Sequence, residues 1–220
     1  TDGAIEACVI DKETMEPTLK IIGDQGQKAV GICGSGIIDL ISELFRCGII
    51  NPKGKFVREG KRVRYDQYGM GSYVLVFQED AGSVKDVEIN EVDIDNFMRA
   101  KGAIFSAIRV MLNSLDFTVD MIDHVYVAGG IGSGINMKNA VNIGMFPDID
   151  LEKFSYIGNS SLSGAYILLL SNEAEEKVQE VSRNMTYLEL SNEPTYMDEF
   201  VASCFLPHTD ATLFPSLTFK

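Results

Sequence analysis

The sequence has 220 residues, of which 45% are hydrophobic and 23% are charged. These proportions are those of globular proteins, so they exclude a disordered chain, a collagen and a coiled coil. There are 19 Lys and Arg against 32 Asp and Glu, and the net charge of -13 excludes a nucleic-acid-binding surface, which needs basic residues. The longest apolar run, at 165–170, is too short to cross a membrane.

The four cysteines, at positions 8, 33, 47 and 204, form no Cys-x-x-Cys pair, and the two histidines are His124 and His208. Zinc and iron–sulfur sites need closely grouped soft ligands, so this spacing predicts neither site. Scattered cysteines are typical of reduced thiols in a cytoplasmic protein, and we expect no disulfide framework. The chain opens with Thr-Asp-Gly-Ala and no signal peptide, so we expect a piece of a longer protein.

The first predicted unit is a hairpin followed by a helix. Short apolar stretches at 4–10 and 18–22, with turns between them, indicate two paired strands. A glycine-rich turn at 31–36 leads into a segment at 37–47 whose apolar residues recur at helical spacing. Ser35 is the predicted N-cap of this helix.

The next segment changes to the period of a strand. Runs at 73–77 and 84–89 predict two short strands, joined by a hairpin turn at 79–82. The basic stretch at 53–64 is predicted to be a solvated loop. Together these residues form a small β-rich insertion at 55–92.

A long helix follows, with Asp93 or Asp95 as its predicted N-cap and an end near Leu115. Lys101 lies four residues after Phe97, which places it on the apolar stripe of this helix. A buried lysine is costly unless an anionic or hydrogen-bonding group receives it. The pattern leaves two interpretations open: Lys101 binds such a group, or its ammonium extends from the edge of the stripe into water.

The second half of the chain contains two successive units, each made of a strand, a glycine-rich turn and a helix. Such units imply parallel strands joined by right-handed crossovers. Glycine permits close approach to the backbone and helix N-termini favour anions, so the pair predicts a nucleotide crevice. The units are the strand 121–128, the turn 129–134 and the helix 137–143, then the strand 154–157, the turn 158–164 and a helix ending near residue 172.

Other catalytic and nucleotide-binding motifs fit less well. Gly130, Gly132 and Gly134 follow a strand, and Asp148 or Asp150 lies near the spacing of a ribose-binding acid, as in a dinucleotide-binding loop. The glycine spacing is not Gly-x-Gly-x-x-Gly, however, and both acids lie in a turn that contains proline. No Gly-Lys-Ser/Thr loop occurs, and neither histidine has a Ser or Cys in a nucleophile elbow.

Four segments carry a resemblance to a known family. They are Gly31-Ile-Cys-Gly-Ser-Gly-Ile-Ile-Asp39, Ala100-Lys101-Gly102-Ala103-Ile104, Val127-Ala-Gly-Gly130 and Phe205-Leu-Pro-His-Thr-Asp210. In this order, over essentially all of the chain, they resemble the C-terminal domain of reductive activators of corrinoid proteins. The segment at 125–134 also resembles the adenosine motif of the acetate and sugar kinase, heat-shock protein and actin superfamily, in which a strand delivers a Gly-Gly turn beneath the nucleotide.

The resemblance implies an α/β fold, namely an RNase H-like (actin-like ATPase) domain with a partly parallel mixed sheet, helices on both faces and the small β-hairpin insertion. Residues 1–220 would be the C-terminal part of that domain. The extension at 185–220 carries a predicted strand at 187–190 and a predicted helix near 196–204. A ferredoxin domain with a [2Fe-2S] cluster and a middle domain would lie upstream, outside this chain.

The resemblance also implies a function and a site. Such proteins use ATP to drive electrons onto Co(II) corrinoid proteins and so restore Co(I). The first turn would lie against the adenosine or α-phosphate of ATP or ADP, a lysine would serve the ribose, and the second turn would close the crevice. The implied residues are Gly129, Gly130, Gly132, Ser133, Lys101, Gly158, Asn159 and Ser160.

Two parts of an actin-like ATPase do not occur in this sequence. These are the two Asp-containing, Gly-rich phosphate loops and the acid that positions Mg²⁺ and water. We therefore expect the adenosine side of a cleft, with no catalytic residue and no metal ligand, and with Mg²⁺ held by the parent protein. The glycines at 34–36 are expected to pack a helix on a sheet and not to touch phosphate.

Two alternatives stay open. One is a structural or dimerisation module whose glycines serve packing alone. The other is the nucleotide-side domain of another superfamily member, such as a dehydratase activator or a small-molecule kinase. In the favoured interpretation the partner is a corrinoid protein, with no nucleic acid and no membrane, and a homodimer stays open.

Overall fold

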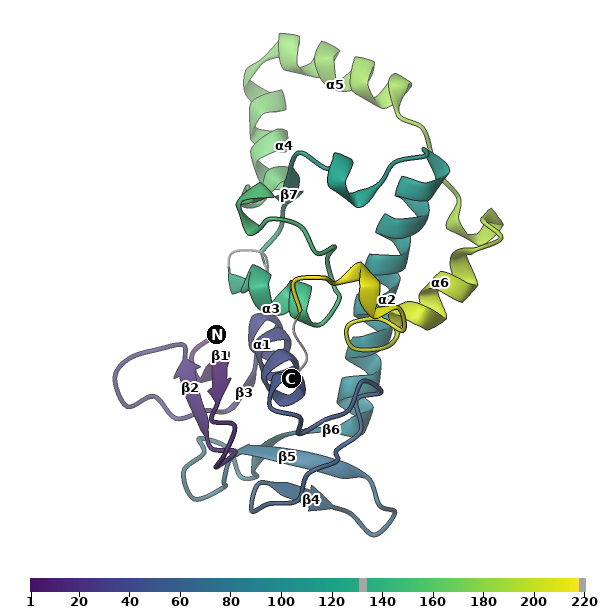
Figure 1. The fold of residues 1–220 in the computed structure, drawn as a ribbon. Coiled ribbons are helices and arrows are strands. Elements are labelled where there is room, and N and C mark those ends of the chain that lie inside the picture. The colour runs from purple at the N-terminus through teal and green to yellow at the C-terminus, as the bar shows by residue number, and fades with distance from the viewer. Residues whose placement is uncertain (131–133, 218–220) are drawn as a thin grey trace.

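The structure is a computed structural model that describes residues 1–130 and 134–217 (Figure 1). Its first sheet has the strand order β2-β1-β3. Strand β1 (Ala4–Ile10) pairs antiparallel with β2 (Pro17–Ile21) and parallel with the short β3 (Gly31–Ile32). The predicted hairpin is confirmed, and the sheet is mixed as expected.

Helix α1 (Gly34–Arg46) follows β3 directly and has Cys33 as its N-cap. The prediction that Ser35 caps this helix is wrong. The Ser35 hydroxyl donates instead to the backbone carbonyl of Glu6, at 3.1 Å, and so ties the first turn of α1 to β1.

Gly36 lets α1 lie directly on β1. A Cβ atom at this position would stand 2.2 Å from the backbone oxygen of Ile5, which real Cβ atoms do not approach. Gly36 therefore serves helix-to-sheet packing, as expected from the sequence, while the same role for Gly34 stays a prediction.

The second sheet has the order β4-β5-β6 and is antiparallel throughout: β4 (Val63–Tyr65), β5 (Gly71–Val76) and β6 (Val87–Asn90). The predicted hairpin is confirmed as β5 and β6, but the basic stretch is not all solvated loop, since it contributes β4. The Arg62 guanidinium donates to the backbone carbonyls of Val74 and Leu75 at 2.9 Å each, so these two hydrogen bonds join the residue before β4 to β5.

Helix α2 (Glu91–Ser114) begins one residue after β6 ends, and its N-cap is Asn90. The Asn90 side chain accepts from the N–H of Asp93 at 3.0 Å, and the Asp93 carboxylate accepts from the N–H of Asn90 at 3.1 Å, which completes a capping box. The prediction of Asp93 or Asp95 as the N-cap is therefore wrong. The predicted end near Leu115 is confirmed.

The third sheet joins β7 (Val125–Val127) to β8 (Phe154–Tyr156) in parallel, so the predicted pair of strand–turn–helix units is confirmed. The predicted strand at 187–190 is wrong, because these residues run into a 3-10 turn and pair with no strand that the structure describes. Helix α3 (Met137–Asn142) lies between β7 and β8, and α4 (Ser160–Leu170) follows β8. Two further helices complete the described chain, α5 (Asn172–Asn184) and α6 (Tyr196–Ser203). The 3-10 turns are Val119–Met121, Leu151–Lys153, Leu190–Asn192 and Ala211–Leu213.

The main hydrophobic core lies between the first sheet, α1, the second sheet and the first half of α2. A smaller cluster of Phe105, Val141 and Phe214 joins α2 to α3 and the C-terminal segment. Helices α4 and α5 bury no residue and project from the rest of the chain (Figure 1). Within the described ranges no helix is both long and apolar enough to span a membrane.

Replacing Gly36 with alanine tests the contact between α1 and β1. We expect a loss of about 1–3 kcal/mol in the free energy of unfolding, because the new methyl group would collide with a backbone oxygen that cannot move aside. Urea unfolding measures the loss. Gly31→Ala is the matched control, since a Cβ there would meet no atom within 4 Å; equal stability of the two variants would contradict the packing role.

Candidate functional site

The two glycine turns of the second half lie side by side at the carboxyl ends of β7 and β8. The ladder continues beyond both strands, since the N–H of Ile157 donates to the carbonyl of Val127 at 3.0 Å and that of Gly129 to the carbonyl of Gly158 at 2.9 Å. Gly129 and Gly158 have φ values of 107° and 73°, which favour glycine. The structure thus brings Gly129, Gly130 and Gly158 together, as the sequence predicts.

The exposed side of both turns is open. A Cβ atom at Gly129, Gly130 or Gly158 would meet no heavy atom of the described residues within 4 Å. Gly130 lacks the positive φ of its neighbour, and no residue that the structure describes crowds the place of a Cβ atom there. Glycine at such a place permits close approach of a ligand to the backbone. The Tyr156 hydroxyl donates to the carbonyl of Gly129 at 2.8 Å and holds the first turn in place.

The second turn opens helix α4. Asn159 is the N-cap of this helix, and its side chain accepts from the N–H of Leu162 at 3.1 Å. Ser160 is the first helical residue, and its N–H donates to the carbonyl of Gly158 at 3.0 Å. The amide groups of the first turn of α4 therefore lie beside Gly129, where partial positive charge favours an anion.

The far end of the first turn meets helix α1. A Cβ atom at Gly134 would lie 3.1 Å from the Ser35 hydroxyl oxygen, so the turn passes close to the start of that helix. Gly132 and Ser133, which the resemblance places in the site, lie outside the described residues. The turn is thus bounded by the second turn on one side and by α1 on the other.

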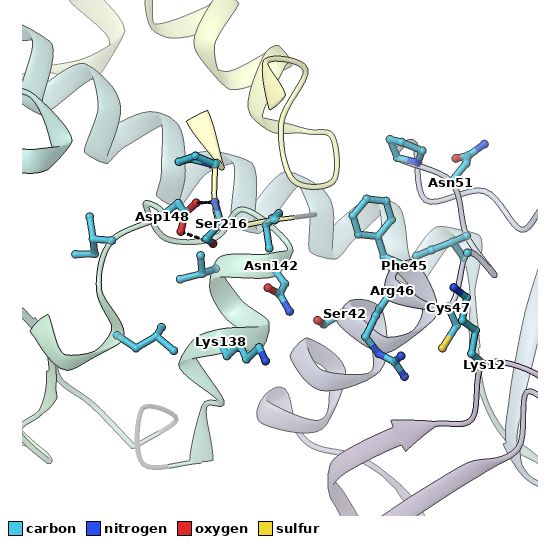
Figure 2. Close-up of a pocket in the computed structure, with 18 of the residues that line it drawn as sticks. Lys12, Ser42, Phe45, Arg46, Cys47, Asn51, Lys138, Asn142, Asp148 and Ser216 are labelled. Atoms are coloured by element: carbon cyan, nitrogen blue, oxygen red, sulfur yellow. Dashed lines mark hydrogen bonds between the residues drawn. The ribbon is translucent and has the colours of Figure 1, made fainter. Parts of the chain in front are cut away.

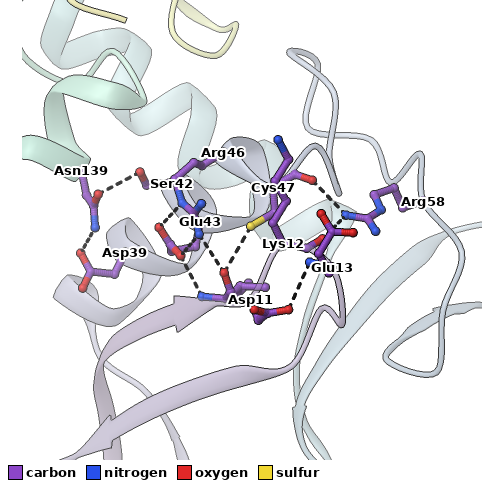
Figure 3. Close-up of polar contacts among 11 residues, drawn as sticks. Asp11, Lys12, Glu13, Asp39, Ser42, Glu43, Arg46, Cys47, Arg58 and Asn139 are labelled. Atoms are coloured by element: carbon purple, nitrogen blue, oxygen red, sulfur yellow. Dashed lines mark hydrogen bonds and ion pairs between the residues drawn. The ribbon is translucent and has the colours of Figure 1, made fainter. Parts of the chain in front are cut away.

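A buried polar network, which the sequence analysis missed, fixes α3 behind the first turn (Figure 3). The Asn139 amide donates to Asp39 at 2.7 Å and accepts from the Ser42 hydroxyl at 3.2 Å, which joins α3 to α1. Burial raises the pKa of Asp39, while the hydrogen bond from Asn139 acts in the opposite direction. Asn136 caps α3 through the N–H of Asn139, so the predicted cap is confirmed.

Lys101 lies in a different environment from the one predicted. It has no exposed surface, and its Nζ donates to the backbone carbonyls of Phe205 and, at 2.7 Å, Pro207. The interpretation in which the ammonium extends into water is therefore wrong. Because Nζ is buried and donates to two backbone carbonyls, it does not reach the protein surface where a ribose could bind. A ribose contact for Lys101 stays a prediction that this geometry does not support.

A large cavity lies at the opposite end of α1 from the first turn (Figure 2). Its volume is about 1230 Å³, and it is lined by the end of α1, by α3 and by the C-terminal segment. Asp148 closes one wall by accepting from the N–H and hydroxyl of Ser216, at 2.7 Å each. Arg46 at the rim is neutralised by Glu43 at 2.7 Å (Figure 3). This cavity is therefore separate from the glycine turns.

Comparison with known proteins gives consistent results. Residues 1–218 match the family described as the C-terminal domain of RACo, the ASKHA domain. A solved structure of a reductive activator for corrinoid, iron-sulfur protein is similar, with a TM-score of 0.91 and 47% sequence identity, over 99% of this chain and 34% of that chain.

Two curated relatives carry related names. The corrinoid activation enzyme RamQ of Eubacterium limosum is 28% identical over 209 residues, which are 91% of this chain and 35% of the relative. The Co(II) methylated amine-specific corrinoid protein reductase of Methanosarcina barkeri is 25% identical over 182 residues, 80% of this chain and 29% of the relative. The chain thus spans about a third of the length of these relatives.

Burial lowers the pKa of Lys101 to about 7, and this makes a prediction about stability. Between pH 7 and about 8.5 the unfolded state, whose lysine has a pKa of about 10.4, binds more protons than the native state, so the free energy of unfolding should rise with pH. His208 titrates below this window, because burial lowers its pKa from its ordinary value. Urea unfolding at several pH values checks the slope, and a Lys101→Met variant with the same slope would assign it to another group.

Proposed function

Since the chain belongs to the family of C-terminal ASKHA domains of RACo, we propose that it is the nucleotide-binding C-terminal part of an ATP-dependent reductive activator that returns Co(II) corrinoid proteins to Co(I). Adenosine of ATP or ADP would lie on Gly129 and Gly130, with Gly158, Asn159 and Ser160 closing the crevice. Gly132 and Ser133 would continue the first turn.

One observation carries the nucleotide-binding part of this proposal. Two glycine turns at the ends of adjacent parallel strands are hydrogen-bonded to each other, and no described residue stands within 4 Å of a Cβ atom built at Gly129 or Gly158. In open α/β sheets ligands bind in the crevice beyond the carboxyl ends of the strands. The residues of this chain would bind and orient the nucleotide through backbone groups, and the first turn of α4 would face its negative charge.

The chemistry of phosphate transfer would belong to other parts of the parent protein. Across the described ranges no three His, Cys, Asp or Glu side chains gather as metal ligands, and the four cysteines are free. The described cysteines therefore form no [2Fe-2S] ligand set, and we assign the cluster to the parent outside this chain. Mg²⁺ needs only one or two carboxylates beside the phosphates; we assign it to the parent because this sequence lacks the Asp-containing phosphate loops. In such a parent the cluster would supply the electron and ATP the driving force.

The proposed partner is a corrinoid protein, and the proposed location is the cytoplasm. The names of the relatives, both activators or reductases of corrinoid proteins, support the partner. A net charge of -13 favours a partner with a basic docking surface. The solved relative at 47% identity supports a corrinoid activator over a kinase or a dehydratase activator.

Dimerisation is a second proposal with an observation of its own. Helix α4 buries no residue, although its sequence is mostly apolar. Leu162, Leu169 and Leu170 are 67%, 85% and 68% exposed. Apolar surface of this kind marks a protein interface, and a second copy of the chain is one candidate for it.

Gly130→Val tests the nucleotide site. The valine side chain would fill the open space above the turn, so we expect ADP affinity to fall by at least about a hundredfold, or roughly 2.7 kcal/mol, in isothermal titration. The fold should be unchanged, because no atom of the described residues lies within 4 Å of the new Cβ; circular dichroism and urea unfolding check this. Gly164→Ala, equally unobstructed but within α4, is the control. Undiminished affinity in Gly130→Val would remove this turn from the site.

The activation reaction is testable in the full-length protein that carries this chain. With a reductant and a corrinoid protein, we expect conversion of Co(II) to Co(I), followed by absorption, to require ATP and to stop in Gly130→Val. The variant should still accept electrons, because we assign the cluster to the parent protein outside this chain. Conversion at the wild-type rate without ATP would contradict the proposal.

A further inference from the structure

The segment after α6 connects α2 with α3. Residues 204–208, called here the C-terminal strap, lie between these two helices (Figure 1). Two backbone hydrogen bonds hold the strap. The N–H of Leu206, in its middle, donates to the carbonyl of Pro52 at 2.9 Å, and the N–H of Thr209, just after it, donates to the carbonyl of Ala202 at 3.1 Å.

One carbonyl of the strap contacts both helices. The Pro207 oxygen accepts from Lys101 Nζ of α2 at 2.7 Å. The same oxygen would lie 2.0 Å from a Cβ atom at Gly144, the residue that ends the turn after α3 with a φ of 73°. Lys101 and Gly144 therefore share this carbonyl, and a change at one side is transmitted to the other.

Helix α3 is fixed on its other side by α1. Asn139 binds Asp39 and Ser42, and Gly134, two residues before the cap of α3, lies against Ser35. The helix has only six residues, so a displacement at Gly144 moves its start as well. Gly134, the described end of the first glycine turn, lies two residues before the cap of α3 and would follow the same displacement.

We infer that Lys101 is a positioning residue for nucleotide binding: it holds the C-terminal strap against Gly144 and thereby fixes α3 and the first glycine turn. This inference rests on the proposed function, because it concerns the same turn. It assigns Lys101 an indirect role through the protein and no contact with the nucleotide.

The chemistry around Lys101 explains why a lysine is needed. The carbonyls of Phe205 and Pro207 both point into the interior, and buried acceptors without donors are costly. An apolar side chain would leave both unsatisfied, whereas even a neutral amine donates two protons. No carboxylate contacts Nζ within the described residues; the nearest titratable groups are Cys204 and His208, and Glu199 is engaged by His208 and Arg109.

Hydrogen exchange on the full-length protein tests the inference without a substitution. Coupling is reciprocal, so ADP bound at the first turn should stabilise the strap. We expect slower exchange of the amides of Leu206 and Thr209 when ADP is added, together with those of Gly129 and Gly130. Protection confined to the glycine turns would overturn the inference and leave the proposed nucleotide site standing.

Lys101→Met tests the same link by removing the donor. We expect ADP affinity to fall about tenfold, and the amides of Gly144 and Met145 to exchange faster. Met98→Ala is the matched control: Met98 is equally buried on α2 but faces Gly54 in the main core, so it should lower stability and leave ADP affinity unchanged. Equal affinity in wild type and Lys101→Met would overturn the inference.

Two further outcomes are distinguishable. If wild type binds no ADP, the proposed function fails. Independently of ADP, unchanged exchange of the Gly144 amide in Lys101→Met would refute the inference that Lys101 holds the strap against Gly144. If Lys101→Met does not fold, Gly144→Ala displaces the same carbonyl from the side of α3. That variant should weaken ADP binding while Lys101 remains, and normal affinity in it would count against the inference.

Discussion

The candidate site depends on the hydrogen bond from the N–H of Gly129 to the carbonyl of Gly158. It extends the pairing of β7 and β8 past the ends of the strands, so two turns that are 29 residues apart in sequence act as one surface. Both glycines need positive φ for this bond to form. Without it, the two turns would be ordinary strand-to-helix connections, and the amides at the start of α4 would not lie beside Gly130.

Local pattern predicts much of the fold and of this site. The strand runs, the glycine turns and the cap of α3 at Asn136 depend on residues close together in sequence, and the structure places them where expected. The N-caps of α1 and α2 were misassigned because each helix begins within two residues of a strand. Cys33 is the one residue between β3 and α1, and Asn90 is the last residue of β6. Strand β4 was missed because its pairing with β5, and not its composition, makes it a strand.

The environment of Lys101 could not be predicted from its own segment. Its two acceptors lie 104 and 106 residues later in the chain, in a segment whose proline content indicates only a tail. The sequence showed that a buried lysine needs a partner, and resemblance suggested a ribose. The structure shows two backbone carbonyls instead. The same holds for Asn139, whose partners on α1 are about a hundred residues earlier.

The structure also separates the reasons for which glycine occurs, which bears on the alternative of a purely structural module. At Gly36 and Gly144 a Cβ atom would stand within 2.2 Å of a backbone oxygen, so these two glycines serve packing. Gly129 and Gly158 are required by positive φ. Gly130, in the first turn, falls in neither group among the residues that the structure describes. Glycine at this position permits a ligand to lie on the backbone, which is compatible with nucleotide binding as well as with a structural module.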